Sequence, residues 1–206
     1  VSVYLDNEPE LVNMLDPRSG LTPLMTALYY MEPEIAGLLI ERGATVNLFE
    51  AAAAGKIDRL RALLDEQPGG VNDFSPDGFQ ALGLAAFFGQ DAAAELLLAR
   101  SAEVNTPSRN RMSVCPLHSA VAARRLRIAR LLIEHGADVN AVQSDGFTPL
   151  MGAAQNGQIE MIELLLARGA RADAARANGQ TALDLARESG HAAAAEWIQR
   201  HAGGEA

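Results

Sequence analysis

Apolar positions along the chain form short paired segments, each with the spacing of a helix. Six leucines mark the segments: Leu24, Leu48, Leu82, Leu117, Leu150 and Leu183. Three residues after each leucine stands an alanine, in the series Ala27, Ala51, Ala85, Ala120, Ala153 and Ala186. Fifteen residues after each leucine stands Leu or Ile, in the series Leu39, Leu63, Leu97, Leu132, Leu165 and Ile198. The pattern predicts a first helix that approaches its neighbours closely at the alanine, and a second helix with a buried apolar seam.

A short motif opens these units and recurs at a nearly constant spacing. Thr148-Pro149-Leu150-Met151 returns 33 residues later as Thr181-Ala182-Leu183-Asp184, and Cys115-Pro116-Leu117-His118 precedes it by 33. Residues 22–25 and 80–83 extend the series towards the N-terminus. A second landmark follows each second helix, at residues 43–47, 101–105, 136–140 and 169–173. Self-similarity at such a period is typical of a repeat protein.

The residues at the ends of the helices indicate how each unit is built. In the Thr-Pro pairs, Thr is suited to the N-cap and Pro to the first helical position, where its missing N–H is harmless. Glycines such as Gly43 and Gly136 supply the left-handed residue that ends a second helix, and Ser101 stands in that place in the third unit. Each unit is therefore expected to be a helix, a turn, a helix and an extended loop. Stacking buries the apolar faces.

The motifs and their period resemble those of ankyrin repeats over nearly the whole chain. The resemblance implies an all-α solenoid, with inner helices lining a concave groove and β-turn fingers projecting along one edge. We expect one domain over residues 1–206. Its divisions are a partial repeat at 1–13, repeats at 14–47, 48–72, 73–105, 106–140 and 141–173, and a C-terminal cap at 174–206 that ends in a frayed tail at 203–206. Alanine-rich units such as residues 82–89 resemble bacterial members of the family.

Two units depart from the pattern in their fingers. Asn47 is followed at once by Leu48, whereas Asn140 stands ten residues before Leu150. The unit at 48–72 has therefore lost its finger, which predicts a notch in the edge. The unit at 106–140 carries two extra residues within 108–114, which predicts a longer finger. We expect both places to matter for the shape that a partner meets.

Composition excludes several classes of function. The formal net charge is −9, so general nucleic-acid binding and docking on an anionic membrane are both unfavourable. The chain holds no apolar run near the ~20 residues that a membrane helix needs. Its single cysteine, Cys115, fits a reducing compartment, and we expect a cytoplasmic protein. Because the chain starts at Val1 and not at Met, a removed N-terminal leader stays an open alternative.

Catalytic and metal-binding motifs are missing from the sequence, so we expect no enzyme, no metal and no cofactor. His118 occupies the position where the resemblance implies hydrogen bonding between repeats. Cys115 replaces the capping Thr three residues earlier. A nucleophilic thiol would need an orienting base and a zinc site about four ligands. Neither accompanies Cys115, so we interpret it as a buried substitute for Thr.

Aromatic residues concentrate where the resemblance places partner recognition, at the fingers and just before the residue that ends each first helix. Seven of the ten aromatics lie there. Five of them are our candidates in the first three units, and Phe147 is a sixth: Tyr29, Tyr30, Phe79, Phe87, Phe88 and Phe147. Aromatic anchors commonly dominate interfaces, which favours an exposed recognition patch. Local packing against neighbouring fingers, which would also include Phe74, is the alternative.

Polar candidates follow further along the chain. Arg109 and Arg111 lie in the long finger, and Arg124 at the base of the first helix of that unit, with Gln155 and Asn156 in the next. In a chain of net charge −9, such a basic strip suits an acidic peptide or a carboxylate. The alternative is an ordinary cluster of surface arginines.

These observations favour a non-catalytic protein-interaction module, monomeric, that binds a partner protein through its groove and fingers. A regulatory or scaffold subunit of an enzyme complex is the alternative. A hydrolase or transferase is disfavoured, because no nucleophile, base and orienting group occur together.

Overall fold

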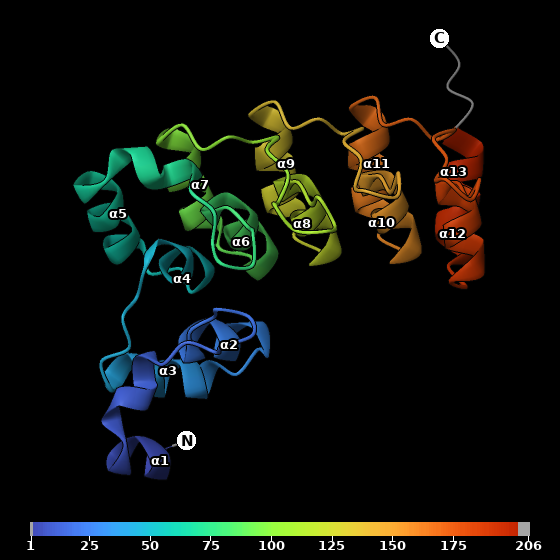
Figure 1. Cartoon of the computed structure of the whole chain (residues 1–206). Helices are drawn as coiled ribbons and strands as arrows, with labels where there is room; N and C mark the ends of the chain where they lie inside the picture. The colour runs from blue at the N-terminus through green and yellow to red at the C-terminus, as the bar shows by residue number, and fades with distance from the viewer. Residues whose placement is uncertain (1, 202–206) are drawn as a thin grey trace. The chain divides into compact units, whose positions relative to one another are not determined.

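The computed structural model describes residues 2–201 (Figure 1). Val1, which begins the predicted partial repeat, and the predicted tail at 203–206 lie outside the described residues. The chain divides into two compact units, Val1–Ala102 and Glu103–Ala206. The single domain over 1–206 and its repeat boundaries stay predictions.

Paired short helices build both units. The first holds α1 (Ser2–Asn7), η1 (Pro9–Asn13), α2 (Pro23–Tyr29), α3 (Pro33–Glu41), α4 (Leu48–Ala53), α5 (Ile57–Glu66), η2 (Pro68–Asn72), α6 (Ala81–Phe88) and α7 (Asp91–Ala99). The second holds α8 (Pro116–Ala122), α9 (Leu126–Glu134), α10 (Pro149–Gln155), α11 (Ile159–Ala167), α12 (Ala182–Glu188) and α13 (Ala192–His201). Within the second unit the pairs stand side by side (Figure 1). The predicted all-α solenoid is confirmed.

The expected capping residues begin and end these helices. The hydroxyl oxygen of Thr22 accepts a hydrogen bond from the Met25 amide, 3.0 Å away, and Thr148 does the same for Met151 at 3.3 Å. Gly136 follows α9 with a φ of +89°, as predicted. Ser101 has a φ of +65°, so it adopts the left-handed conformation without being glycine.

The turn between the first and second helix of a unit also requires a left-handed residue. Glycine fills this position in most units, for example Gly89 with a φ of +77°. Met31 and Arg124 fill it in two others, with φ of +55° and +60°. A residue with a Cβ pays roughly 1–2 kcal/mol for this conformation. These two positions therefore hold local strain.

The alanines three residues after each marker leucine are buried, as predicted, and Ala51, Ala85 and Ala120 have no exposed surface at all. The second seam is buried too, with Leu97, Leu132 and Leu165 at 0% exposure.

Leu63 is the exception, because it is only half-buried. In α5 the buried residues are Leu60 and Leu64 instead. Arg59 stands exposed on the same helix and its Nε donates to the Val46 carbonyl at 3.1 Å. The prediction of a buried Leu63 is thus wrong, because α5 turns a different face inward.

Asparagine side chains fasten successive repeats together near the fingers. Asn105 donates from Nδ2 to the Gly136 carbonyl at 2.9 Å, and its Oδ1 accepts from the Asp138 amide at 2.8 Å. Asn140 makes the same pair with Gly169 and Arg171, at 3.0 and 2.8 Å. Asn13 repeats the pattern in the first unit with Gly43 and Thr45. Each asparagine thereby pairs backbone groups that the next repeat leaves open.

Asn47 stands at the corresponding position but does something else, because its repeat has no finger. Its Oδ1 accepts from the Phe49 and Glu50 amides, so Asn47 caps α4 directly. The helix therefore begins directly at Leu48, without a finger before it. The predicted notch is narrowed by its neighbours: a Cβ on Gly20, in the preceding finger, would lie 3.2 Å from Cβ of Pro76 in the following one. A cavity of about 220 Å³ remains there, lined by residues that include Leu15, Asn47 and Pro76.

Candidate functional site

Three of the predicted aromatic residues come together in the first unit. Tyr29, Phe79 and Phe88 pack around a small cluster of buried residues, Met25, Ala53 and Leu84. The rings of Tyr29 and Phe88 lie 5.5 Å apart between centroids, inclined at 49°. All three aromatic side chains are half-buried. They therefore contribute to local packing and still present part of their surface, and their role in recognition stays a prediction.

Hydrogen bonding fixes the position of the Tyr29 ring. Its hydroxyl donates to the Asp77 carboxylate at 2.5 Å, which links α2 to the finger at residues 73–79. Burial and the Asp77 carboxylate together raise the pKa of Tyr29, so the hydroxyl stays protonated. Phe87 meets Phe88 edge to face, with 5.3 Å between the ring centroids. Phe87 is half-buried as well.

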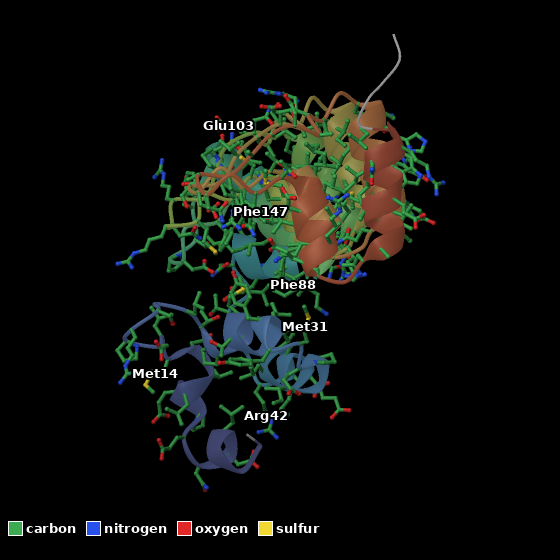
Figure 2. The ribbon with its side chains drawn as sticks, turned by 90° about the vertical axis from the view of Figure 1, so that its right-hand side faces the viewer. Met14, Met31, Arg42, Phe88, Glu103 and Phe147 are labelled. Carbon is green, nitrogen blue, oxygen red and sulfur yellow. The ribbon has the colours of Figure 1, made fainter. Side chains whose placement is uncertain are left out.

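Tyr30 is the predicted aromatic that lies outside this packing, with 77% of its surface exposed. The strained Met31 follows it and is also exposed. Figure 2 shows Met31 close to Phe88, and both line a groove of about 410 Å³. Most of the other lining is apolar as well: Leu28, Pro33, Ala36, Gly37, Ile40, Ala53 and Ala54, with Glu32, Lys56 and Gln90. Sequence reasoning missed this groove, although Met31 in a glycine position was a signal.

In the second unit, Phe147 is held in place from several sides. Nε2 of His118 lies 3.2 Å from the Phe147 carbonyl, which confirms the predicted hydrogen bond between repeats. Burial lowers the pKa of His118, so the ring is neutral near pH 7. The Arg176 guanidinium lies over the Phe147 ring, 5.5 Å from its centroid, and pairs with Asp145. Phe147 is half-buried, and a Cβ on Gly152 would lie 3.3 Å from its ring.

The predicted basic strip is distributed over both ends of α8. Arg109 and Arg111 lie exposed in the loop before α8, and Arg124 follows the helix. Seven helical residues separate the two ends by about 10 Å. Nη2 of Arg124 donates to the Asn156 carbonyl at 2.8 Å, which brings these two predicted residues together. Gln155 is exposed beside Asn156. Whether these residues bind a partner stays a prediction, as it does for the aromatic residues.

The single cysteine thiol in the chain is buried in a structural contact. Cys115 is buried, and its Sγ lies 3.4 Å from the Asn105 carbonyl, an arrangement that does not cap α8. Burial raises the pKa of this thiol, which keeps it protonated and unreactive. Residues 2–201 contain no group of three or more His, Cys, Asp or Glu side chains placed to hold a metal ion.

Glu50 is a buried acid that sequence reasoning missed, with 1% of its surface exposed. It accepts hydrogen bonds from the Thr22 hydroxyl and, at 2.8 Å, from the Asn47 amide. One carboxylate thus ties the start of α2 to the start of α4. Burial raises the pKa of Glu50, and the two hydrogen bonds oppose that rise.

The net charge is distributed unevenly. Residues 1–102 contain 15 acidic and 6 basic residues, whereas residues 103–206 contain 11 of each. The whole formal charge of −9 therefore belongs to the first unit.

Comparison with known proteins agrees with the helix pairs, the capping residues and the fingers. The family model for "Ankyrin repeats (3 copies)" matches residues 48–143 and 117–205, and the model for a single "Ankyrin repeat" matches residues 19–51. The chain belongs to the ankyrin repeat family. Families of this kind are protein-interaction modules, so a protein partner is expected.

Several relatives of this ankyrin protein are animal proteins. It is 30% identical over 159 residues to the nuclear factor NF-kappa-B p105 subunit of Gallus gallus, which covers 70% of this chain and 16% of the relative. It is 34% identical over 145 residues to neurogenic locus notch homolog protein 1 of Xenopus tropicalis. This alignment covers 70% of this chain and 5% of the relative. Against the B-cell lymphoma 3 protein homolog of Mus musculus the identity is 30% over 148 residues, covering 66% and 33%.

The chain thus spans a third or less of the length of these relatives. Its predicted likeness to bacterial members stays a prediction. Of the helices described, none has both the length and the apolar character that crossing a membrane requires.

Proposed function

We propose that this ankyrin protein is a non-catalytic module that binds a partner protein through the aromatic surface of its first unit. That surface consists of Tyr29, Tyr30, Phe79, Phe87 and Phe88. The observation that carries the proposal is Tyr30, a large aromatic side chain that is 77% exposed and follows directly after Tyr29, one of three half-buried rings that pack together. An exposed aromatic residue on a packed base is typical of an interface anchor.

The rigidity of the base supports the same proposal. Phe88 and Tyr29 are held by ring contacts and by the Asp77 hydrogen bond, so they are ordered before a partner arrives. A preformed surface loses less conformational entropy on binding than a mobile one. In the second unit, Arg109, Arg111, Arg124, Phe147, Gln155 and Asn156 are proposed as additional contacts. A cytoplasmic, monomeric protein fits this role.

The experiment is affinity capture from a lysate, comparing the wild type with Tyr30→Ala by quantitative mass spectrometry. Val142→Ala is the matched control, because Val142 is an exposed apolar residue of the second unit. We expect a protein that is retained by the wild type and the control but lost from Tyr30→Ala, and that binds again when purified. If every captured protein is retained equally by all three, the aromatic surface is not the interface.

The same capture distinguishes the alternative role. A regulatory or scaffold subunit would bring down an enzyme whose activity changes when the purified ankyrin protein is added. Analytical ultracentrifugation of the free chain tests the monomer.

A further inference from the structure

The groove beside the aromatic surface is bordered by one face of a helix. One wall is formed by Pro33, Ala36, Gly37 and Ile40, which stand at helical spacing along one face of α3. This face extends over the eight residues 33–40, and its two ends are about 10 Å apart. The groove volume, about 410 Å³, falls within the range of about 300–1,000 Å³ that is typical of binding pockets.

The middle of this α3 face leaves space for a partner's backbone to approach closely. Gly37 is exposed in the middle of α3, and a Cβ placed on it would meet no atom within 4 Å. Ala36 next to it is small and buried. At one end of the groove, Met31 keeps an exposed side chain in a backbone conformation that favours glycine. Strain of this kind often marks a functional position.

Charge indicates the class of helix that fits. Glu32 lines the groove. Glu34 and Glu41 stand exposed on α3, and Asp58 stands exposed on α5. Lys56 balances Glu32 in the lining, and Arg59 and Arg61 stand exposed near Asp58 on α5, so the acidic excess is a property of the first unit as a whole. The first unit as a whole carries the net charge of −9. A surface of this charge attracts basic partners and repels acidic ones.

We propose that the groove between α3 and the ends of α4 and α6 binds a basic amphipathic helix of a partner protein. Its apolar residues, at i, i+3, i+4 and i+7, enter the groove against Met31, Gly37 and Ile40. Its Lys and Arg side chains pair with Glu32 and the acidic residues around it. The proposal rests on the proposed function, since it names the class of partner that a protein-interaction module of this charge takes.

The test uses a synthetic, fluorescently labelled 15-residue peptide with leucines at helical spacing and Lys or Arg on the other faces. A matched peptide carries Glu in place of every Lys and Arg. Binding to the full chain is measured by fluorescence anisotropy at low and at physiological salt. The variants are Gly37→Phe, which fills the groove, and Gly37→Ala, which adds only a methyl group where there is space.

We expect the basic peptide to bind at least about tenfold more tightly than the acidic one, a difference of about 1.4 kcal/mol. Gly37→Phe should weaken the basic peptide by about tenfold or more, and Gly37→Ala should leave it within about threefold of the wild type. Circular dichroism and thermal melting confirm that both variants fold. Glu32→Lys should also weaken the basic peptide, whereas Glu95→Lys, on α7 and away from the groove lining, should change its affinity less.

Several results would overturn the proposal. One is equal affinity of wild type and Gly37→Phe for the basic peptide, and another is equal affinity for the two peptides. A chain that binds neither peptide but dimerises, with a dimer lost in Gly37→Phe, would assign the groove to a second copy instead. If the groove fails these tests while the Tyr30-dependent capture persists, the proposed function stands without this inference. If the groove passes but no captured protein depends on Tyr30, the aromatic surface is wrong.

Discussion

Two junctions between neighbouring repeats differ in what joins them. Where α8–α9 meets α10–α11, a finger lies between the repeats, and His118 bonds to its Phe147 carbonyl while Gln158 reaches back to the Val121 carbonyl at 2.9 Å. Where α2–α3 meets α4–α5, the finger is missing and the buried Glu50 carboxylate ties Thr22 to Asn47. There α2 and α4 approach each other closely at fewer positions than α8 and α10 do.

The grooves at the two junctions also differ, in their volume and in how apolar their lining residues are. The one at the starts of α9 and α11 has about 340 Å³ and is lined by Arg124, Gln158 and Glu160 among others. The one beside α3 and α4 has about 410 Å³ and a mostly apolar lining. The comparison suggests that a finger does more than present residues to a partner. It also brings successive helix pairs closer together, as the fewer close approaches between α2 and α4 indicate.

The largest difference between the two regions should be the cost in stability of shortening a leucine in the second helix of a repeat, α9 compared with α5. Leu132→Ala in α9 should lower the free energy of unfolding by about 2–5 kcal/mol, because Leu132 is fully buried and its loss leaves a cavity. Leu63→Ala in α5 should cost clearly less, since Leu63 is half-buried. Urea unfolding curves of both variants measure the difference. A cost below about 0.5 kcal/mol for Leu132→Ala would contradict the register of the repeats.

Leu132 and Leu63 also show how far the sequence predicts the fold. Both stand fifteen residues after a marker leucine, so periodicity alone treats them alike. Periodicity predicted the helices, the caps and the alanine column correctly, because these depend on local spacing and on contacts repeated in every unit. It failed at Leu63, because the face that α5 buries, with Leu60 and Leu64, is decided by tertiary packing that a local period does not specify.

The candidate site was predictable to a smaller extent. The resemblance to ankyrin repeats placed Tyr29, Phe79 and Phe88 on the recognition surface, and the structure brings these three side chains together. Their half-buried state depends on Met25 and Leu84 beneath them, which no motif indicates. The groove is built from α3 and the turns that follow α2 and α4, and the buried Glu50 depends on a contact across 28 residues of sequence with Thr22, so no local motif indicates either.

The second prediction concerns the cap that replaces the finger. Asn47→Ala should lower the free energy of unfolding by about 0.5–2 kcal/mol, because the Phe49 and Glu50 amides lose their acceptor. Asn47→Asp is the matched control, since Asp caps helices about as well as Asn. Chemical denaturation compares the three proteins. A loss in Asn47→Asp as large as in Asn47→Ala would show that capping is not the role of Asn47.

A third prediction uses the two strained turns. Met31→Gly should raise the free energy of unfolding by up to about 1 kcal/mol, because it removes the strain of a left-handed Met that is largely exposed. Arg124→Gly should gain less, since it also removes the hydrogen bond to the Asn156 carbonyl. Thermal melts of the two variants rank the gains, and the reverse ranking would contradict the assignment of Arg124 to a stabilising contact.

The smallest effect is the pH dependence of the Glu50 tie. Because burial raises the pKa of Glu50, the folded state keeps this proton to a higher pH than the unfolded state does. The contribution of Glu50 to stability is therefore greatest below its ordinary pKa of 4.5 and declines as pH rises through the folded pKa. Denaturant unfolding of wild type and Glu50→Gln between pH 4 and 8 gives the difference. As pH rises, the free energy of unfolding of the wild type should fall relative to that of Glu50→Gln. A rise relative to Glu50→Gln would contradict a raised pKa of Glu50 in the folded state.

The most direct test of the account is native-state hydrogen exchange, because it measures how readily each helix pair opens. The pair α2–α3, next to the missing finger, is compared with α12–α13, which also lies towards a chain end but follows a finger and packs closely on α10 and α11. We predict that amides of α2–α3 open at a lower free energy than those of α12–α13. Equal protection of the two pairs, or stronger protection of α2–α3, would contradict the claim that the finger controls the packing of its repeat.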